Sequence, residues 1–261
     1  ATDSIAIGQL AMSGVTTGAA HCNIAIGKSA LLGSASTTGA LNIALGVLAM
    51  DALTTGGQNI GIGDQALGAA TTGSRNIAIG SEALNTGVVT GSDNISIGRS
   101  SSDAMTCGAC NIAFGLNALG ASETGCLNIA IGELAMGAGV TTASCTVAIG
   151  VNAGTALTSG EGSVFIGRSA GAGVTTGSQN IAIGCIALGV ATTTGADNIA
   201  LGYRSLDALT CGHNNIGMGR NALGASETGC YNVAIGETAM ATGVVTGKCN
   251  IGIGIGAGLK L

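Results

Sequence analysis

The chain lacks several residue types that ordinary globular domains use freely. It has 261 residues but no proline, no tryptophan, two Phe, two Tyr and two His, and charged residues make up only 8%. A globular domain is about a quarter charged and fills a thick core with aromatic side chains. This scarcity excludes a thick aromatic core. The 48 glycines and the many small aliphatic residues predict a thin, closely packed core instead.

The sparse charges also exclude several classes of function. The net charge of −5 comes from scattered residues, so the basic stripe of a nucleic-acid-binding surface is missing and we predict no nucleic-acid partner. No apolar run approaches the roughly 18 residues of a membrane span, so we predict none. His21 and His213 lie far apart along the chain without an acidic residue beside them. We therefore predict no catalytic site, no metal site, no cofactor and no enzymatic activity.

The motif Asn-Ile-Ala-Ile-Gly recurs along the whole chain. After two spacings of 19 residues, it recurs at spacings of 17, 17 and 18 residues. A longer segment, NALGASETGC, occurs at both 117–126 and 221–230. A short fixed period indicates stacked structural units. We predict one continuous repeat domain over residues 1–261, with coils that begin at residues 4, 23, 42, 59, 76, 94, 111, 128, 146, 163, 180, 198, 215, 232 and 250.

The residue pattern within one coil predicts an all-β fold. No 3.6-residue period is present, so we expect a parallel β-solenoid or β-roll of 17–19-residue coils. Fifteen coils stacked about 4.8 Å apart would extend over about 70 Å. Coil positions 2 and 4 are always Ile, Val, Leu, Met or Phe, and position 3 is almost always small. We expect positions 2 and 4 to face the core, and position 3 to face outward where another surface can approach closely.

Two further features of the coil predict its turns. Position 5 is Gly in every coil, either because its φ angle is positive or because another backbone passes nearby. Positions 8 and 9 are usually Ala-Leu, and we expect them to return a second strand to the same core. A Thr-Thr-Gly segment then closes the coil.

Position 1 of the coil is Asn in twelve of the fifteen coils. A stacked column of Asn side chains can form an amide ladder by hydrogen bonding from coil to coil. The alternative is that Asn is only a turn residue before a strand. The candidate ladder consists of Asn23, Asn42, Asn59, Asn76, Asn94, Asn111, Asn128, Asn180, Asn198, Asn215, Asn232 and Asn250.

Nine cysteines are unusual in so restricted a composition. Several of them fall near the ends of consecutive coils, close enough for cross-coil disulfides if the protein is extracellular. The candidates are Cys110, Cys126, Cys145, Cys230 and Cys249, with Cys110–Cys126 and Cys230–Cys249 as possible pairs. The alternative is that all are small turn residues that remain thiols.

The repeats NIAIGSEAL at 76–84, NIAIGELAM at 128–136 and NVAIGETAM at 232–240 resemble a known class of sequence. They resemble repeats of phage and virus tail-fibre-like proteins and, more distantly, the β-roll head repeats of trimeric autotransporter adhesins. The resemblance implies an extracellular, virion-surface or cell-surface fibre, often a homotrimer. The 17–18-residue coil, the extra cysteines and the absence of a heptad stalk are departures from the adhesin pattern.

We therefore expect a structural subunit of a surface fibre or filament. Its partner would be another copy of itself, in an end-to-end filament or a homotrimer, and the terminal coils at 4–8 and 250–254 lack obvious polar caps. The alternative is a binding module, either an adhesin that recognises cell-surface glycans or an ice-binding protein that presents its recurring threonines in a regular row.

Overall fold

Short strands are the recurring element of the fold. A computed structural model describes residues 3–15, 20–33, 37–86, 89–242 and 246–258, and within these ranges it contains three-residue strands and no helix. The chain forms two compact units, Ala1–Leu127 and Asn128–Leu261. The first unit contains β1 (Ile5–Ile7), β2 (Ile24–Ile26), β3 (Ile43–Leu45), β4 (Ile60–Ile62), β5 (Ile77–Ile79), β6 (Ile95–Ile97) and β7 (Ile112–Phe114). The second contains β8 (Ile129–Ile131), β9 (Val147–Ile149), β10 (Val164–Ile166), β11 (Ile181–Ile183), β12 (Ile199–Leu201), β13 (Ile216–Met218), β14 (Val233–Ile235) and β15 (Ile251–Ile253).

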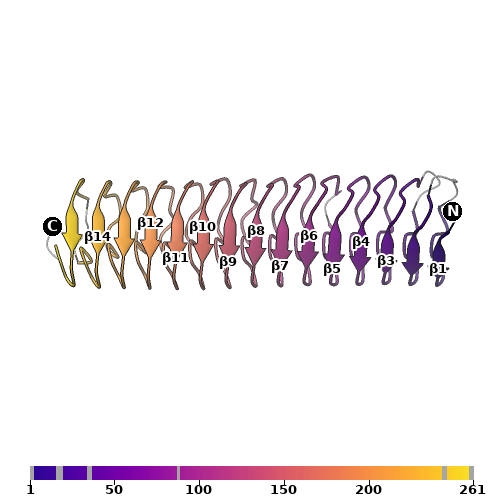
Figure 1. Ribbon diagram of the computed structural model, residues 1–261, viewed down its shortest axis with the longest axis horizontal. Coiled ribbons are helices and arrows are strands. Elements are labelled where there is room, and N and C mark those ends of the chain that lie inside the picture. The colour runs from indigo at the N-terminus through magenta and orange to yellow at the C-terminus, as the bar shows by residue number, and fades with distance from the viewer. Residues whose placement is uncertain (1–2, 16–19, 34–36, 87–88, 243–245, 259–261) are drawn as a thin grey trace. The chain divides into compact units, whose positions relative to one another are not determined.

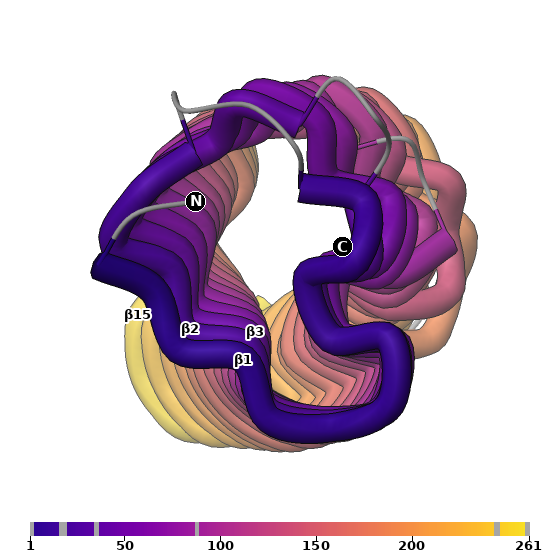
Figure 2. The backbone as a smooth tube through the Cα atoms, turned by 90° about the vertical axis from the view of Figure 1, so that its right-hand side faces the viewer, coloured from indigo at the N-terminus to yellow at the C-terminus, as the bar shows by residue number. Residues whose placement is uncertain are grey.

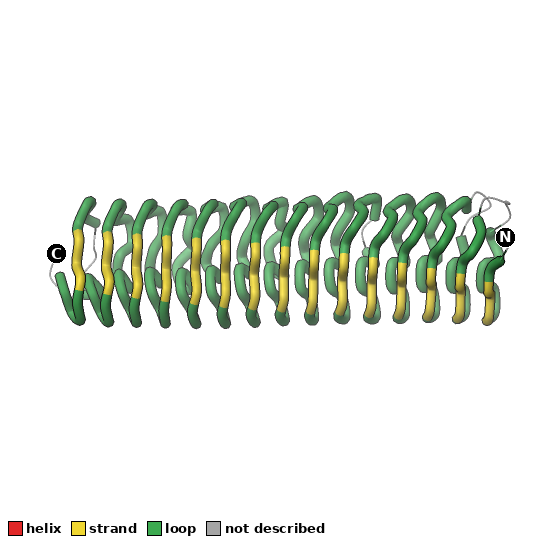
Figure 3. The backbone as a smooth tube through the Cα atoms, in the orientation of Figure 1, coloured by secondary structure: helices red, strands yellow, loops and turns green. Residues whose placement is uncertain are grey.

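Within each unit, every strand pairs in parallel with the next strand in the chain (Figure 1). Equivalent coil positions are partners, as in Ile60↔Ile77 and Gly61↔Ala78. The other described residues of each coil lie in turns, loops and a few isolated bridges (Figure 3). The coils of β1, β2 and β3 lie one behind another (Figure 2). Each unit is therefore a parallel β-solenoid, which confirms the predicted fold class and coil length. That the repeat domain is continuous stays a prediction.

The interior of the coil is lined by positions that the sequence pattern assigned to the outside. Position 3 is buried in every strand from β2 to β15, as in Ala44 and Ala78, whereas Ile62 at position 4 is 37% exposed and Phe114 is 54% exposed. The prediction that positions 2 and 4 face the core was wrong. Inside the coil, the turn that carries positions 8 and 9 lies directly against the strand: a Cβ added to Gly61 would lie 3.0 Å from Met50 Cε and 3.1 Å from the Ala66 carbonyl oxygen. Only a small residue fits there.

Two coils show how positions 3 and 9 share this narrow space. In the coil of β6, position 3 is Ser96 and position 9 is Ser102, and their hydroxyl oxygens lie 2.7 Å apart. In the coil of β10, position 3 is the buried Phe165, and the ninth residues of this coil and the one before it are Gly171 and Gly154. The ring of Phe165 occupies the space that a leucine fills in other coils.

The expected second strand at positions 8 and 9 is also absent. These residues form turns in which positions 7 and 9 have positive φ angles, as in Gln65 (56°) and Leu67 (55°). The Leu67 amide donates a hydrogen bond to the Ala83 carbonyl of the next coil at 2.9 Å. The left-handed conformation costs non-glycine residues roughly 1–2 kcal/mol each, so coil-to-coil hydrogen bonds and packing must offset it.

Both explanations offered for the glycine at position 5 apply. Gly63 has a φ of +137°, and an added Cβ would lie 2.5 Å from the Gly80 carbonyl oxygen of the next coil. The strand therefore ends where the backbone conformation suits only glycine and where the next coil leaves no room for a side chain.

Candidate functional site

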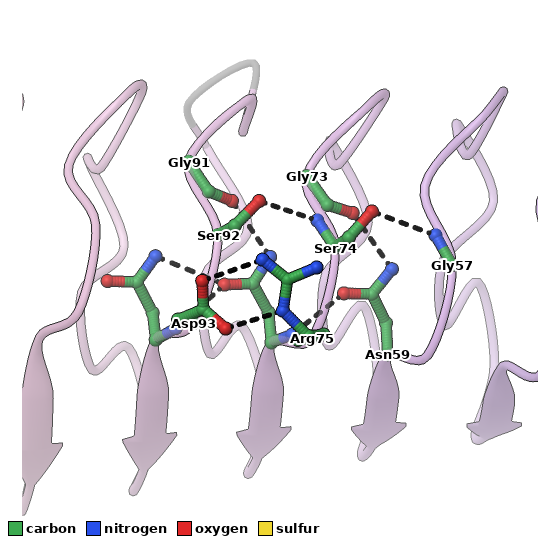
Figure 4. Close-up of polar contacts among 10 residues, drawn as sticks. Gly57, Asn59, Gly73, Ser74, Arg75, Gly91, Ser92 and Asp93 are labelled. Carbon is green, nitrogen blue, oxygen red and sulfur yellow. Dashed lines mark hydrogen bonds and ion pairs between the residues drawn. The ribbon is translucent and has the colours of Figure 1, made fainter.

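The asparagines at position 1 form hydrogen-bonded columns within each unit (Figure 4). The Asn59 side-chain amide donates to Asn42 Oδ1 at 3.1 Å and to the Gly73 carbonyl at 2.9 Å. Asn59 Oδ1 accepts from the Asn76 backbone amide at 2.9 Å. Each asparagine thus closes its own coil and ties it to its neighbours. No buried side-chain nitrogen or oxygen among the described residues lacks a partner.

The column continues through the coils that lack asparagine in the second unit. The Thr146 amide donates to Asn128 Oδ1 at 3.0 Å, and the Asn180 amide donates to the Ser163 hydroxyl oxygen at 3.1 Å. The Ser163 hydroxyl therefore takes over the acceptor role of an asparagine, whereas the Thr146 hydroxyl donates to the Ser144 carbonyl at 3.4 Å. The predicted ladder residues line the interior: Asn23, Asn42, Asn59, Asn76, Asn94, Asn111, Asn128, Asn180, Asn198, Asn215 and Asn232 are buried, and Asn250 is half-buried.

The last two residues of several coils form polar contacts from coil to coil outside this column. The Ser74 hydroxyl oxygen accepts from the Gly57 amide, and the Ser92 hydroxyl oxygen accepts from the Ser74 amide, both at 3.1 Å. Arg75 donates two hydrogen bonds to Asp93, at 2.6 and 2.8 Å (Figure 4). This contact holds the pKa of the Asp93 carboxyl below its usual value. Because the pair is exposed, these bonds position the turn and contribute little stability.

The structure contains no disulfide, and all nine cysteines lie within the described residues. The four cysteines of the candidate cross-coil pairs Cys110–Cys126 and Cys230–Cys249 are free thiols in the structure, and each pair combines two different rows. Cys110 and Cys249 are the last residues of their coils and are exposed, whereas Cys126 and Cys230 are second-last and lie deeper. Cys145 lines a shallow surface pocket of about 380 Å³ with Glu161, Gly162, Ser178 and Gln179.

The threonines at the coil ends separate into two rows. The fifth-last residue is half-buried in several coils and donates to the next coil, as from the Thr54 hydroxyl to the Thr71 carbonyl at 2.8 Å. The fourth-last residue is exposed, as in Thr55, Thr72 and Thr90, and Cys107 replaces it in the same row. Among the described residues, the threonine row at the fourth-last position is therefore the more exposed of the two.

The outward face of the strands repeats regularly from coil to coil. Positions 2 and 4 form two rows of large apolar side chains in each unit, half-buried or exposed, and no charged residue occurs in either row. Alongside them, position 6 carries charges of both signs, including Arg220, which lies 3.3 Å from Glu237 of the next coil. An apolar strip with a mixed charged rim resembles the general layout of protein–protein interfaces.

The described part of the chain offers little else. No three His, Cys, Asp or Glu side chains there converge on a possible metal position, and no helix there is long and apolar enough to cross a membrane. One pair that sequence reasoning missed is Cys230 and His213, whose Sγ and Nδ1 atoms lie 3.3 Å apart. The signal was available, because both are second-last residues of consecutive coils.

Comparison with known proteins adds no family to these findings. A scan against protein-family models found no match for this chain, and a search of curated proteins found no match either. The structure itself defines the class of protein as a parallel β-solenoid of about 17-residue repeats.

Proposed function

We propose that this protein is a structural subunit of an extracellular or virion-surface fibre, and that its copies associate through the outward face of the strands. The observation that carries the proposal is the pair of uncharged rows at positions 2 and 4. Exposed contiguous apolar strips of this kind mark interaction surfaces in soluble proteins. The sequence resemblance to tail-fibre-like repeats supports the same function.

The occupant of this face is a second copy of the chain. The face is a strip whose side chains repeat once per coil, at about 4.8 Å. A surface with the same repeat can match every side chain along the strip, and the chain itself supplies such a surface. The position 6 rim contains both Arg220 and Glu237, so a second copy meets charges of both signs. Position 3, which the sequence suggested as the contact, is buried inside the coil and has no part in it.

The size of the face sets the expected strength of association. Three residues at about 3.3 Å and seven strands at about 4.8 Å give the first unit a strip of about 330 Å². A stable interface typically buries about 800 Å² per partner. One unit alone is therefore expected to associate weakly, and association should strengthen as more coils take part, which suits a protein that builds long fibres.

Analytical ultracentrifugation of the purified chain tests this proposal. We expect a concentration-dependent dimer or trimer in the wild type, and a monomer when Ile62→Glu and Ile79→Glu place two charges in the position 4 row. The matched control, Thr55→Glu with Thr72→Glu, adds the same charges to the exposed threonine row and should associate as the wild type does. A wild type that stays monomeric, or a control that dissociates equally, contradicts the proposal.

A binding module is the second candidate, and the exposed threonine row favours it. Thr55, Thr72 and Thr90 present hydroxyl groups at a regular coil-to-coil spacing, which an ice surface or a glycan chain can meet. Thermal hysteresis and glycan-array binding measure these activities directly. Loss of either activity in the Thr55→Glu, Thr72→Glu variant, with the Ile62→Glu, Ile79→Glu variant unaffected, would favour this candidate over the fibre.

A further inference from the structure

We propose that Cys230 and His213 form a binding site for a thiophilic d¹⁰ metal ion such as Zn²⁺ or Cd²⁺. The two residues are second-last in consecutive coils of the second unit, and Cys230 Sγ lies 3.3 Å from His213 Nδ1. In a tetrahedral site with a Zn–S bond of about 2.3 Å and a Zn–N bond of about 2.0 Å, sulfur and nitrogen lie about 3.5 Å apart. The pair therefore already has nearly the spacing of two ligands of one ion.

The surroundings hold this pair in place. Cys230 is 5% exposed, and its Sγ lies 3.5 Å from the Thr228 carbonyl oxygen. The ring of Tyr231 packs edge-on against the ring of His213, with centroids 5.3 Å apart. On the other side Cys230 pairs with Lys248, which is exposed. The thiol and the imidazole are thus preorganised, and loss of side-chain freedom on binding is small.

The site is open, because the protein supplies only two ligands. Metal binding replaces the Sγ proton: the ion takes the thiolate and the neutral imidazole nitrogen, the proton passes to solvent, and water completes the coordination. Thiolate and imidazole together favour Zn²⁺, Cd²⁺ or Cu⁺ over Mg²⁺ and Ca²⁺, which prefer oxygen ligands.

The duplicated segment of the first unit provides a natural control. Cys126 occupies the same place in NALGASETGC as Cys230, and its Sγ also lies 3.5 Å from a threonine carbonyl oxygen, that of Thr124. The residue one coil earlier is Ala109, where the second unit has His213. The two thiols thus share one local geometry, and only Cys230 has an imidazole beside it.

Titration of the reduced, full-length protein with Cd²⁺ alone, followed by the ultraviolet thiolate-to-metal charge-transfer band, tests the site. We expect the wild type and Cys126→Ser each to bind one molar equivalent of Cd²⁺ tightly. His213→Ala keeps all nine thiols and places alanine beside Cys230, as Ala109 stands beside Cys126. In this variant the affinity for the tightly bound Cd²⁺ ion should fall at least about tenfold. Cys230→Ser should lose it.

A gain-of-function variant makes the test independent of any folding defect in these losses. Ala109→His places an imidazole beside Cys126, and we expect a second tight equivalent of Cd²⁺. Circular dichroism confirms that each variant is folded. A His213→Ala protein that titrates as the wild type does would overturn the proposal, because the ion would then be bound by cysteines without the imidazole.

Discussion

Neighbouring residues of one strand meet two different environments. Ala78 at position 3 is fully buried, and Ile79 at position 4 lies on the outer face and is half-buried. Inside, the turn of positions 8 and 9 lies so close that only a small side chain fits, and hydrogen-bonded asparagines fix the coil spacing. Outside, the Ile79 side chain remains partly open to solvent.

This difference teaches that, within the strand, the small residue and not the large ones faces the interior of the coil. A large aliphatic residue stabilises by the area that it buries, so it tolerates exchange for another of similar size. A residue in a space with no spare volume tolerates almost no substitution by a larger residue. The predictions below compare substitutions at tightly packed positions with substitutions outside them.

The largest expected effect is at glycines packed against the next coil. Gly167→Ala places a Cβ 2.8 Å from the Gly184 carbonyl oxygen at a φ of +127°, and we expect a loss of about 4 kcal/mol in the free energy of unfolding. The control is Gly162→Ala on the outer surface, where the nearest atom would be Gln179 Cγ at 3.7 Å and φ is +66°. We expect a loss of about 1 kcal/mol there. Urea unfolding measures both, and equal losses would contradict the packing argument.

The second largest loss of stability is expected in the asparagine column, and this loss depends on pH. Asn59→Asp replaces an amide that donates to Asn42 Oδ1 and the Gly73 carbonyl with a carboxylate that cannot donate. We expect a loss of about 3 kcal/mol at pH 7. Burial among acceptors raises the pKa of the new carboxyl in the folded state, so the loss should shrink as the pH falls and the carboxyl is protonated.

Thermal unfolding at pH 7 and at about pH 3, below the usual aspartate pKa of about 3.9, measures this dependence. Gln58→Glu, one residue away on the exposed surface, is the control and should change little at either pH. A loss for Asn59→Asp that is the same at both pH values would argue against direct donation by the Asn59 amide.

A smaller, opposite effect is expected at Asp51 in the first unit. Partial burial raises the pKa of the Asp51 carboxyl, so the folded state binds a proton more readily than the unfolded state. Stability is then lost as the pH rises from below the unfolded pKa through the folded one. Asp51→Asn should therefore raise the melting temperature at pH 7. The corresponding gain in the free energy of unfolding should be less than about 1 kcal/mol, because solvent screens this partly exposed group. The gain should vanish in acid, and a gain independent of pH would show another cause.

The smallest expected effect is at an exposed residue with a positive φ angle. Gln58 has a φ of 61°, and asparagine tolerates this conformation better than glutamine does. We expect Gln58→Asn to stabilise the protein by about 0.5 kcal/mol. Gln9→Asn, at an exposed position without a positive φ angle, should have no effect in the same chemical unfolding experiment. Destabilisation by Gln58→Asn would mean that the glutamine side chain makes an unrecognised contribution.

The fold class and the coil length could be predicted because the spacing of the motif is a direct consequence of the number of residues in one coil. The inward face of the strand could not be predicted from alternation, because both faces are apolar: alanine on one side and isoleucine on the other. Size was a misleading guide, since the usual rule places the larger residue inside.

Two coils have paired changes at positions 3 and 9, and these pairs indicate which face of the strand points inward. Ser96 occurs in the same coil as Ser102, and Phe165 occurs where Gly154 and Gly171 replace the usual ninth residue. Each pairing indicates that positions 3 and 9 share one space. Likewise, comparing the second-last residues of consecutive coils would have placed His213 beside Cys230. The candidate disulfide pairs rested on the closeness of neighbouring coils and left out the row in which each cysteine lies.

The most direct test of the account compares Ala78→Glu with Ile79→Glu, two neighbours in β5, by thermal unfolding at a protein concentration where the chain is monomeric. The account predicts that Ala78→Glu fails to fold or loses at least about 4 kcal/mol, because an unpaired charge enters the interior. It predicts that Ile79→Glu changes the free energy of unfolding by about 1 kcal/mol or less. The reverse order, with Ile79→Glu the more damaging, would place the isoleucines in the core and contradict the account.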